Sequence, residues 1–210
     1  GSYTKAVNGY STAIGTRSQA LNSGASALGS QALAREQRST ALGNLSYAGS
    51  SVSTAVGYET IVADTAYSSS ALGSGSVASG QYSGVWSSSR NLNPTALVAD
   101  ERSFVGGNNS YAIGNKNVIG SSSSDTFILG NNVKLGATAA MLTSTNSQGT
   151  NNDISTRTET VGYTGLTNIT GMVALGSNTG VAVSDGVALG QGSQATVAKG
   201  VAGYDPLNAA

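Results

Sequence analysis

A polar residue, an alanine, a large aliphatic residue and a glycine follow one another near the N-terminus, and this motif returns every fourteen residues. Copies end at Gly15, Gly29, Gly43 and Gly57, and two later copies, again fourteen apart but with valine in place of the polar residue, end at Gly176 and Gly190. A fixed short period is typical of repeat proteins, in which similar units stack on one another. The sequence therefore predicts a stack of turns and a long surface rather than a pocket.

Within the motif, successive side chains alternate in character, which is typical of a β-strand. One set, here called the leucine column, is large and aliphatic: Ile14, Leu28, Leu42, Val56, Leu72, Ile113, Leu129, Leu175 and Leu189. The other set, the alanine column, is small: Ala13, Ala27, Ala41, Ala55, Ala71, Ala112, Ala174 and Ala188.

A second short strand is expected between successive motifs, for example at residues 19–21, 61–63 and 133–135. Two strands of about five residues and two turns of about two residues add up to the observed period. The predicted architecture is all-β: a coil with two strands per turn, stacked into two parallel sheets.

A coil this narrow holds few apolar side chains per turn, too few to offset comfortably the conformational entropy lost on folding. A flat column of alanines would allow another backbone to approach closely. We therefore predict that the alanine column packs against copies of the chain around a symmetry axis, while the leucine column fills each coil. The alternative is that alanine only tolerates crowding inside the coil and that the chain is a monomer.

Composition excludes several kinds of chemistry. Ten basic and ten acidic residues balance, so no nucleic-acid partner is indicated. The chain has no cysteine and no histidine, which excludes disulfides, thiolate metal sites and the usual catalytic triads. No run of 18 apolar residues is present, so no membrane-spanning helix is expected.

The period divides the chain into segments. Residues 1–2, Gly1-Ser2, resemble the remnant of a cleaved tag, so the chain is interpreted as an excised fragment. The expected order is then roll repeats at 3–73, an irregular region at 74–110, roll at 111–136, a second irregular region at 137–160, roll at 161–203 and the start of another module at 204–210. The irregular regions are either distorted turns or loops that leave the roll.

Motifs that suggest chemistry are weak. Residues 190–195 (GQGSQA) fit a dinucleotide-binding fingerprint, but a strand rather than a helix is expected after them. Asp100 and Glu101 are adjacent, so in a strand their carboxylates would point in opposite directions. We therefore predict no enzymatic activity, no cofactor and no metal.

Three residues of the first irregular region are candidates for ligand contact. Tyr82, Trp86 and Arg90 belong to the residue types that dominate binding hot spots. The alternative for Trp86, the only tryptophan, is that it fills a widened turn or caps an assembled core.

The repeated motif resembles the head repeats of the YadA-like trimeric autotransporter adhesins. The best matches are Tyr111-Ala112-Ile113-Gly114, Val173-Ala174-Leu175-Gly176 and Gly186-Val187-Ala188-Leu189-Gly190-Gln191-Gly192-Ser193. The resemblance implies a left-handed parallel β-roll, assembled as a homotrimer, on the surface of a Gram-negative bacterium. It also implies a coiled-coil stalk and a C-terminal outer-membrane barrel, neither of which is expected within this fragment.

The same resemblance implies a function. Such heads attach, without catalysis, to host matrix or cell-surface proteins, and the family's range includes collagen, fibronectin, laminin and carcinoembryonic-antigen-type receptors. A phage tail fibre or a purely structural spacer is the alternative. A β-solenoid enzyme fits less well, because the step of fourteen is not a multiple of six and histidine is absent.

Overall fold

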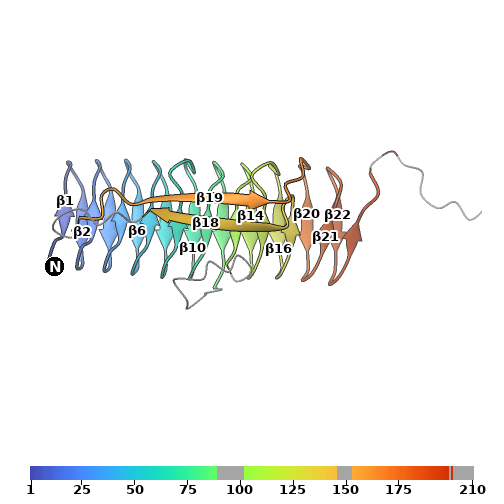
Figure 1. Cartoon of the computed structure of the whole chain (residues 1–210), viewed down its shortest axis with the longest axis horizontal. Coiled ribbons are helices and arrows are strands. Elements are labelled where there is room, and N and C mark those ends of the chain that lie inside the picture. The colour runs from blue at the N-terminus through green and yellow to red at the C-terminus, as the bar shows by residue number, and fades with distance from the viewer. Residues whose placement is uncertain (89–101, 146–152, 199, 201–210) are drawn as a thin grey trace, which may run out of the picture.

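The described residues form a straight rod of stacked turns with no helix among them (Figure 1). The structure is a computed structural model, and it describes residues 1–88, 102–145, 153–198 and 200. The prediction of an all-β parallel roll with a repeat of about fourteen residues is confirmed.

Each turn contributes one strand to each of two parallel sheets. The ten-stranded sheet, called the even sheet, contains the repeated motif. Its strands are β2 (Thr12–Ile14), β4 (Ser26–Leu28), β6 (Thr40–Leu42), β8 (Thr54–Val56), β10 (Ser70–Leu72), β12 (Gly84–Trp86), β14 (Tyr111–Ile113), β16 (Phe127–Leu129), β20 (Val173–Leu175) and β22 (Val187–Leu189).

The nine-stranded sheet, called the odd sheet, is built from strands of two residues. They are β1 (Lys5–Ala6), β3 (Gln19–Ala20), β5 (Leu33–Ala34), β7 (Tyr47–Ala48), β9 (Ile61–Val62), β11 (Val77–Ala78), β13 (Phe104–Val105), β15 (Val118–Ile119) and β17 (Lys134–Leu135). A further pair, β21 (Gly180–Val181) and β23 (Gln194–Ala195), forms a short parallel sheet at the C-terminal end.

The sheets continue through both regions where the sequence period breaks. Within residues 74–110, β11, β12 and β13 pair with their neighbours, and Trp86 lies between Leu72 and Ile113 in the even sheet. In the second region the chain leaves the roll after β17 and returns in β20, which pairs with β16. The roll is thus one continuous stack with a single described excursion.

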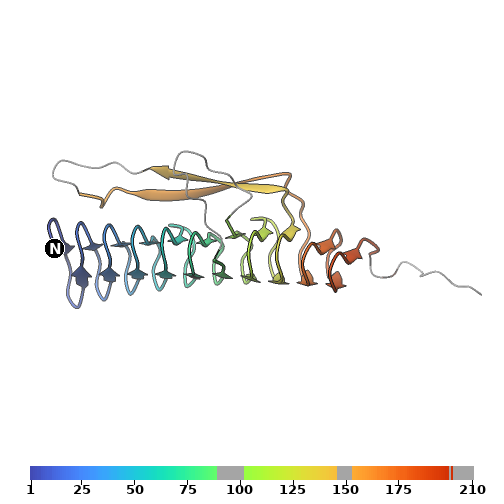
Figure 2. The same cartoon turned by 90° about the horizontal axis from the view of Figure 1, so that it is seen from below.

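That excursion is an antiparallel hairpin of β18 (Ala139–Thr145) and β19 (Thr158–Thr164). It runs along the rod and lies over the odd sheet, on the side opposite the even sheet (Figure 2). Gly162, which the fourteen-residue step would place in the roll, lies in β19. Roll structure resumes in β20 rather than at residue 161.

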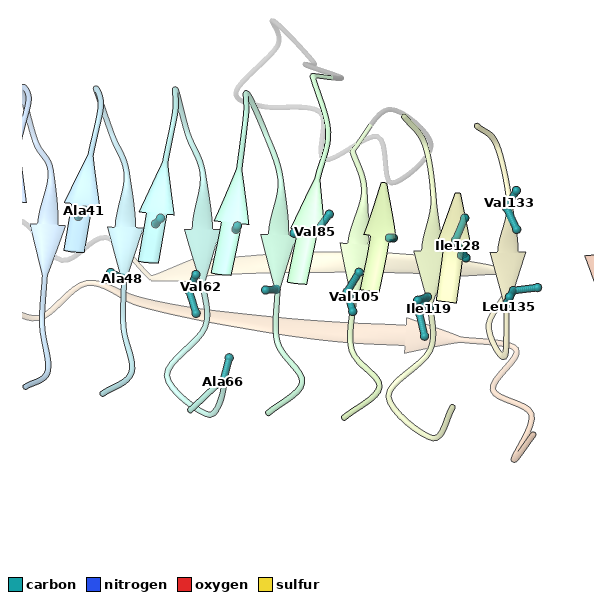
Figure 3. Close-up of a cluster of buried hydrophobic side chains, with 14 of the residues drawn as sticks. Ala41, Ala48, Val62, Ala66, Val85, Val105, Ile119, Ile128, Val133 and Leu135 are labelled. Atoms are coloured by element: carbon teal, nitrogen blue, oxygen red, sulfur yellow. The ribbon is translucent and has the colours of Figure 1, made fainter. Parts of the chain in front are cut away.

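The interior of the roll is lined by alanines in its N-terminal half. Ala27, Ala41 and Ala55 of the even sheet are fully buried and cluster with Ala34 and Ala48 of the odd sheet. Farther along, larger side chains take over, including Val62, Val85, Val105, Ile119, Ile128 and Leu135 (Figure 3).

The prediction that the leucine column fills the interior is wrong. Leu42 is 44% exposed and Leu189 is 60% exposed, whereas Ala41 and Ala188, one position earlier, are buried. The two sheets of each narrow coil face one another so closely that the small side chain points inward and the large one outward. Of the alanine column, Ala13 is half-buried and the others are enclosed in their own coil, so they are not available to a second copy.

Buried serines explain why so polar a composition folds. The hydroxyls of Ser39, Ser46 and Ser83 donate to the carbonyls of Glu36, Gly43 and Gly80 at 2.6, 2.9 and 2.7 Å. Each of these bonds satisfies a backbone carbonyl inside a tight turn, where an unpaired polar group would be costly. The serine-rich turns are therefore part of the buried structure.

The turns place many non-glycine residues at positive φ, and Val52 is the least suited of them. Its φ is 58°, a left-handed conformation that costs an ordinary residue about 1–2 kcal/mol and is rare for a β-branched one. We expect Val52→Asn to raise the free energy of unfolding by about 0.5–1 kcal/mol, because Asn tolerates this conformation. Denaturant unfolding should show no such gain for Val7→Asn, since Val7 is similarly exposed but is not at positive φ.

Candidate interaction surfaces

The outer face of the even sheet carries the leucine column as a continuous apolar stripe. Ile14 is 59% exposed at the N-terminal end, and the stripe continues through Leu42, Ile113 and Leu129 to Leu189. In-register pairing places each member directly beside the next one along the rod. The sheet thus presents one apolar line over its whole length.

The other outward position of the same strands changes character along the rod. In β2 to β10 it holds a threonine or serine: Thr12, Ser26, Thr40, Thr54 and Ser70. From β14 onward it holds Tyr111, Phe127, Val173 and Val187. The C-terminal half of this face is therefore more apolar than the N-terminal half.

Of the three candidate contact residues, the two that the structure describes, Tyr82 and Trp86, lie in different parts of their turn. Trp86 ends β12 and takes the place of a leucine in the stripe, with 59% of its surface exposed. Tyr82 lies in a turn, where its ring meets Tyr67 edge to face at a centroid distance of 5.6 Å. Arg90 lies outside the described residues. Trp86 fills no turn; it belongs to the surface stripe.

An open hollow of about 240 Å³ lies beside Trp86. Its lining comes from the ends of two neighbouring turns, Ser87 and Ser88 on one and Ile113, Gly114 and Asn115 on the other. The hollow is continuous with the stripe and has no charged lining residue, so it offers an apolar shelf rather than a reactive site.

The odd sheet presents a second apolar face, which the hairpin covers. The outward residues of its middle strands are Leu33, Tyr47, Ile61, Val77, Phe104 and Val118, all buried. From the hairpin, Ala140, Leu142, Val161 and Tyr163 pack against them. At the ends of the sheet, Lys5 and Lys134 take the same position and are exposed.

A polar cluster fixes the hairpin near its distal end. Arg157 Nε donates to Glu159 Oε1 at 2.6 Å, and its guanidinium lies 5.1 Å from the ring centroid of Tyr47. Arg157 also donates to the Leu45 carbonyl at 3.1 Å, and Tyr47 Oη donates to Asp64. Burial raises the pKa of Glu159, against the lowering effect of Arg157.

Farther toward the tip, Asp153 joins the hairpin connection to the first strand of the roll. Its carboxylate lies 3.5 Å from Lys5 Nζ and accepts the Ser155 N–H at 2.9 Å. The backbone hydrogen bond from Ser155 is the main reason that the pKa of Asp153 falls to about 2. Together with the Arg157 cluster, this contact holds the hairpin flat along the rod.

Two tyrosines, the buried Tyr47 and the half-buried Tyr163, link the hairpin to alkaline stability. Burial raises the pKa of both Tyr47 and Tyr163 above the usual value of 10.0, and the hydrogen bond to Asp64 adds to the rise at Tyr47. Above pH 10 the unfolded chain releases these two phenolic protons, whereas the folded chain keeps them. Their contribution to the free energy of unfolding is therefore complete below pH 10 and is lost as the pH rises above it. We expect the free energy of unfolding to fall less steeply between about pH 9.5 and 11 in Tyr47→Phe and in Tyr163→Phe than in the wild type. Denaturant unfolding across that range checks this, and an unchanged slope in both variants would contradict it.

Sequence reasoning missed the hairpin interface, although a signal for it was present. The position that is Lys5 and Gln19 in the first odd strands becomes Leu33, Tyr47 and Ile61 in the next ones. An outward position that turns apolar over a limited stretch indicates that something covers it there. The Thr-rich alternation of residues 139–145 and 158–164 then supplies the cover.

The repeated turns match a known family. The family model for the YadA head domain repeat matches residues 6–32, 22–46, 34–60 and 65–83. The matched turns, residues 6–60 and 65–83, are YadA-like head repeats. The later strands β14 to β22 lie outside the matched residues but continue the same even sheet in register. A search of curated proteins found no match to the chain.

Such repeats are typical of trimeric autotransporter adhesins, a family of proteins that are anchored in the outer membrane and displayed at the cell surface. Heads of this family and solenoids of this kind are typically non-enzymatic. Within the described ranges, no group of three or more His, Cys, Asp or Glu side chains could hold a metal ion. Since the described residues contain no helix, they include none that could span a membrane.

Proposed function

We propose that three copies of this YadA-like head assemble side by side through the leucine column, and that the trimer attaches a bacterial cell to host proteins. The supporting observation is the apolar stripe itself. Monomeric proteins rarely expose connected apolar patches larger than a few hundred Å². A stripe that runs the length of a rod needs a partner of the same length, and a second copy of the chain is such a partner.

Assembly about a threefold axis parallel to the rod would bury the three even sheets and leave the three odd sheets outside. The hairpins, which lie over the odd sheets, would then form part of the outer surface (Figure 2). Three identical outer faces on each fibre, and many fibres on each cell, convert modest single contacts into strong attachment.

The proposed partners are host matrix or cell-surface proteins. Collagen, fibronectin, laminin and carcinoembryonic-antigen-type receptors are the classes that the family suggests. The outer surface has few charges and no deep pocket among the described residues, so many weak contacts to an extended partner suit it better than capture of a small molecule. Attachment to the bacterium is proposed to occur through a C-terminal membrane anchor.

Two measurements test this function. Sedimentation equilibrium should give a mass three times that of one chain, and the purified protein should attach to cultured epithelial cells in a saturable way. A monomeric mass would overturn the assembly. A trimer that does not attach to the cells would instead support a structural spacer.

A further inference from the structure

The hairpin is the least protected part of the described structure. Among the described residues its sheet consists of β18 and β19, so each strand has a described neighbour on one side and none on the other. Both strands have seven residues, against two or three in every strand of the roll. A row of unpaired N–H and C=O groups of that length is a template for another strand.

The edge of β18 carries none of the features that natural proteins use to prevent such pairing. Its sequence, AAMLTST, has no charged residue, no proline and no glycine. The residues Thr143, Ser144 and Thr145 are all exposed, so both faces of this half of the strand are accessible. In β19, residues that face the roll still alternate with exposed ones, and Glu159 and Tyr163 are among those that face the roll. Because β19 contains the charged Glu159 and a glycine, Gly162, the edge of β18 is the less protected of the two against pairing.

The surroundings of the hairpin restrict what can reach this edge. The hairpin lies flat on the roll, and the turns of the roll extend beyond it on both sides (Figure 1). Antiparallel pairing of two hairpins would place both rolls on the same side of the joint sheet, where their turns would collide. A single extended segment is slim enough to lie beside β18 on the roll surface.

We propose that the open edge of β18 takes one extended, weakly charged segment of a host surface protein as a third strand of the hairpin sheet. Main-chain hydrogen bonds supply affinity in this mode of recognition, and alternate side chains supply specificity. The proposal rests on the adhesin function proposed above and places its partner contact on the outer side of the assembly.

A disulfide-trapping experiment tests the strand pairing directly, because the chain has no cysteine of its own. The variant Thr143→Cys is incubated with synthetic peptides that have the sequence of residues 158–164, a strand already seen to pair with β18. Each peptide carries one cysteine, moved through its seven positions in turn. Cross-strand neighbours lie within reach of a disulfide and successive residues point to opposite faces, so trapping should vary with a period of two.

The matched control is Thr160→Cys, which lies directly opposite Thr143 on the same face of the hairpin. A peptide added beside β18 would be one strand farther from it, so trapping should be about tenfold slower. A peptide with proline at its centre should also be trapped more slowly, since it lacks a backbone N–H. Equal rates at Thr143→Cys and Thr160→Cys, or rates that do not depend on the peptide position, would overturn the proposal.

A second arm separates this inference from the adhesin function. Thr143→Lys/Thr145→Lys should reduce attachment to epithelial cells about tenfold, because lysines at an edge discourage pairing. The matched variant Thr160→Lys/Thr164→Lys adds the same charge to β19 and should attach like wild type. If wild type and the β18 variant attach equally, the edge proposal fails while the function stands. If wild type does not attach, both fail.

Discussion

Replacing Leu42 and Leu129 together by glutamate is expected to leave the chain folded but monomeric. Both side chains lie on the outer face of the even sheet, so the change buries no charge in a single chain. In the proposed trimer each substitution would bring three carboxylates together at an apolar axis. Burying unpaired charges costs several kcal/mol, enough to prevent assembly. Sedimentation equilibrium reports the mass, and circular dichroism reports whether the β structure is kept.

The matched control is Met141→Glu. Met141 is also an exposed apolar residue, but it lies on the hairpin over the odd sheet, away from the leucine column. This variant should keep the mass of the wild type. A double Leu42→Glu/Leu129→Glu variant that still sediments as a trimer would show that another surface holds the copies together.

The periodicity alone was sufficient to predict the parallel roll. A motif that ends in Gly15, Gly29 and Gly43 specifies the length of a turn, and two alternating stretches per period specify two sheets. The same residues pair in register in the structure, for example Ala27 with Ala41. Such local patterns predict local geometry well because every turn contacts mainly its two neighbours.

The alternation of small and large side chains did not determine which face of the strand points into the coil. It separates Ala41 from Leu42, but the choice of the interior depends on the distance between the two sheets. We expected the larger side chain inside, because a flat column of alanines on the outside would let another copy of the chain approach closely. The second strands contained the deciding hint: Ala20, Ala34 and Ala48 also recur at the period, and a coil lined by alanines from both sheets is narrow.

The pattern contains a signal that something covers the odd sheet, but it could not predict which residues meet there, because the contacts of the hairpin join residues far apart in the sequence. Tyr47 meets Arg157, and Ser79 Oγ lies 2.9 Å from Tyr163 Oη. Such pairings depend on the direction in which the chain leaves the roll. The same holds for Trp86: its type suggested a contact residue, and only the register with Leu72 and Ile113 places it in the stripe.

The glycine that ends each motif leads to the second prediction: Gly43→Ala should lower the free energy of unfolding by about 3 kcal/mol or more. Gly43 has a φ of 129°, a conformation that L-residues with a side chain rarely adopt. A Cβ at this place would also run into the backbone carbonyl of Gly57 in the next turn. That carbonyl belongs to a regular stack and cannot move without disturbing the following turn. Denaturant unfolding at a fixed protein concentration measures the loss.

Gly162→Ala is the matched control for this prediction. Gly162 lies in β19, and a Cβ added there would meet no atom within 4 Å. Its substitution should change the free energy of unfolding by no more than about 0.5 kcal/mol, as at most surface positions. Comparable small losses in both variants would mean that the roll can relax around a side chain at Gly43. The close stacking of successive turns would then not be the reason that glycine recurs at this place, and the fourteen-residue period would need another physical cause.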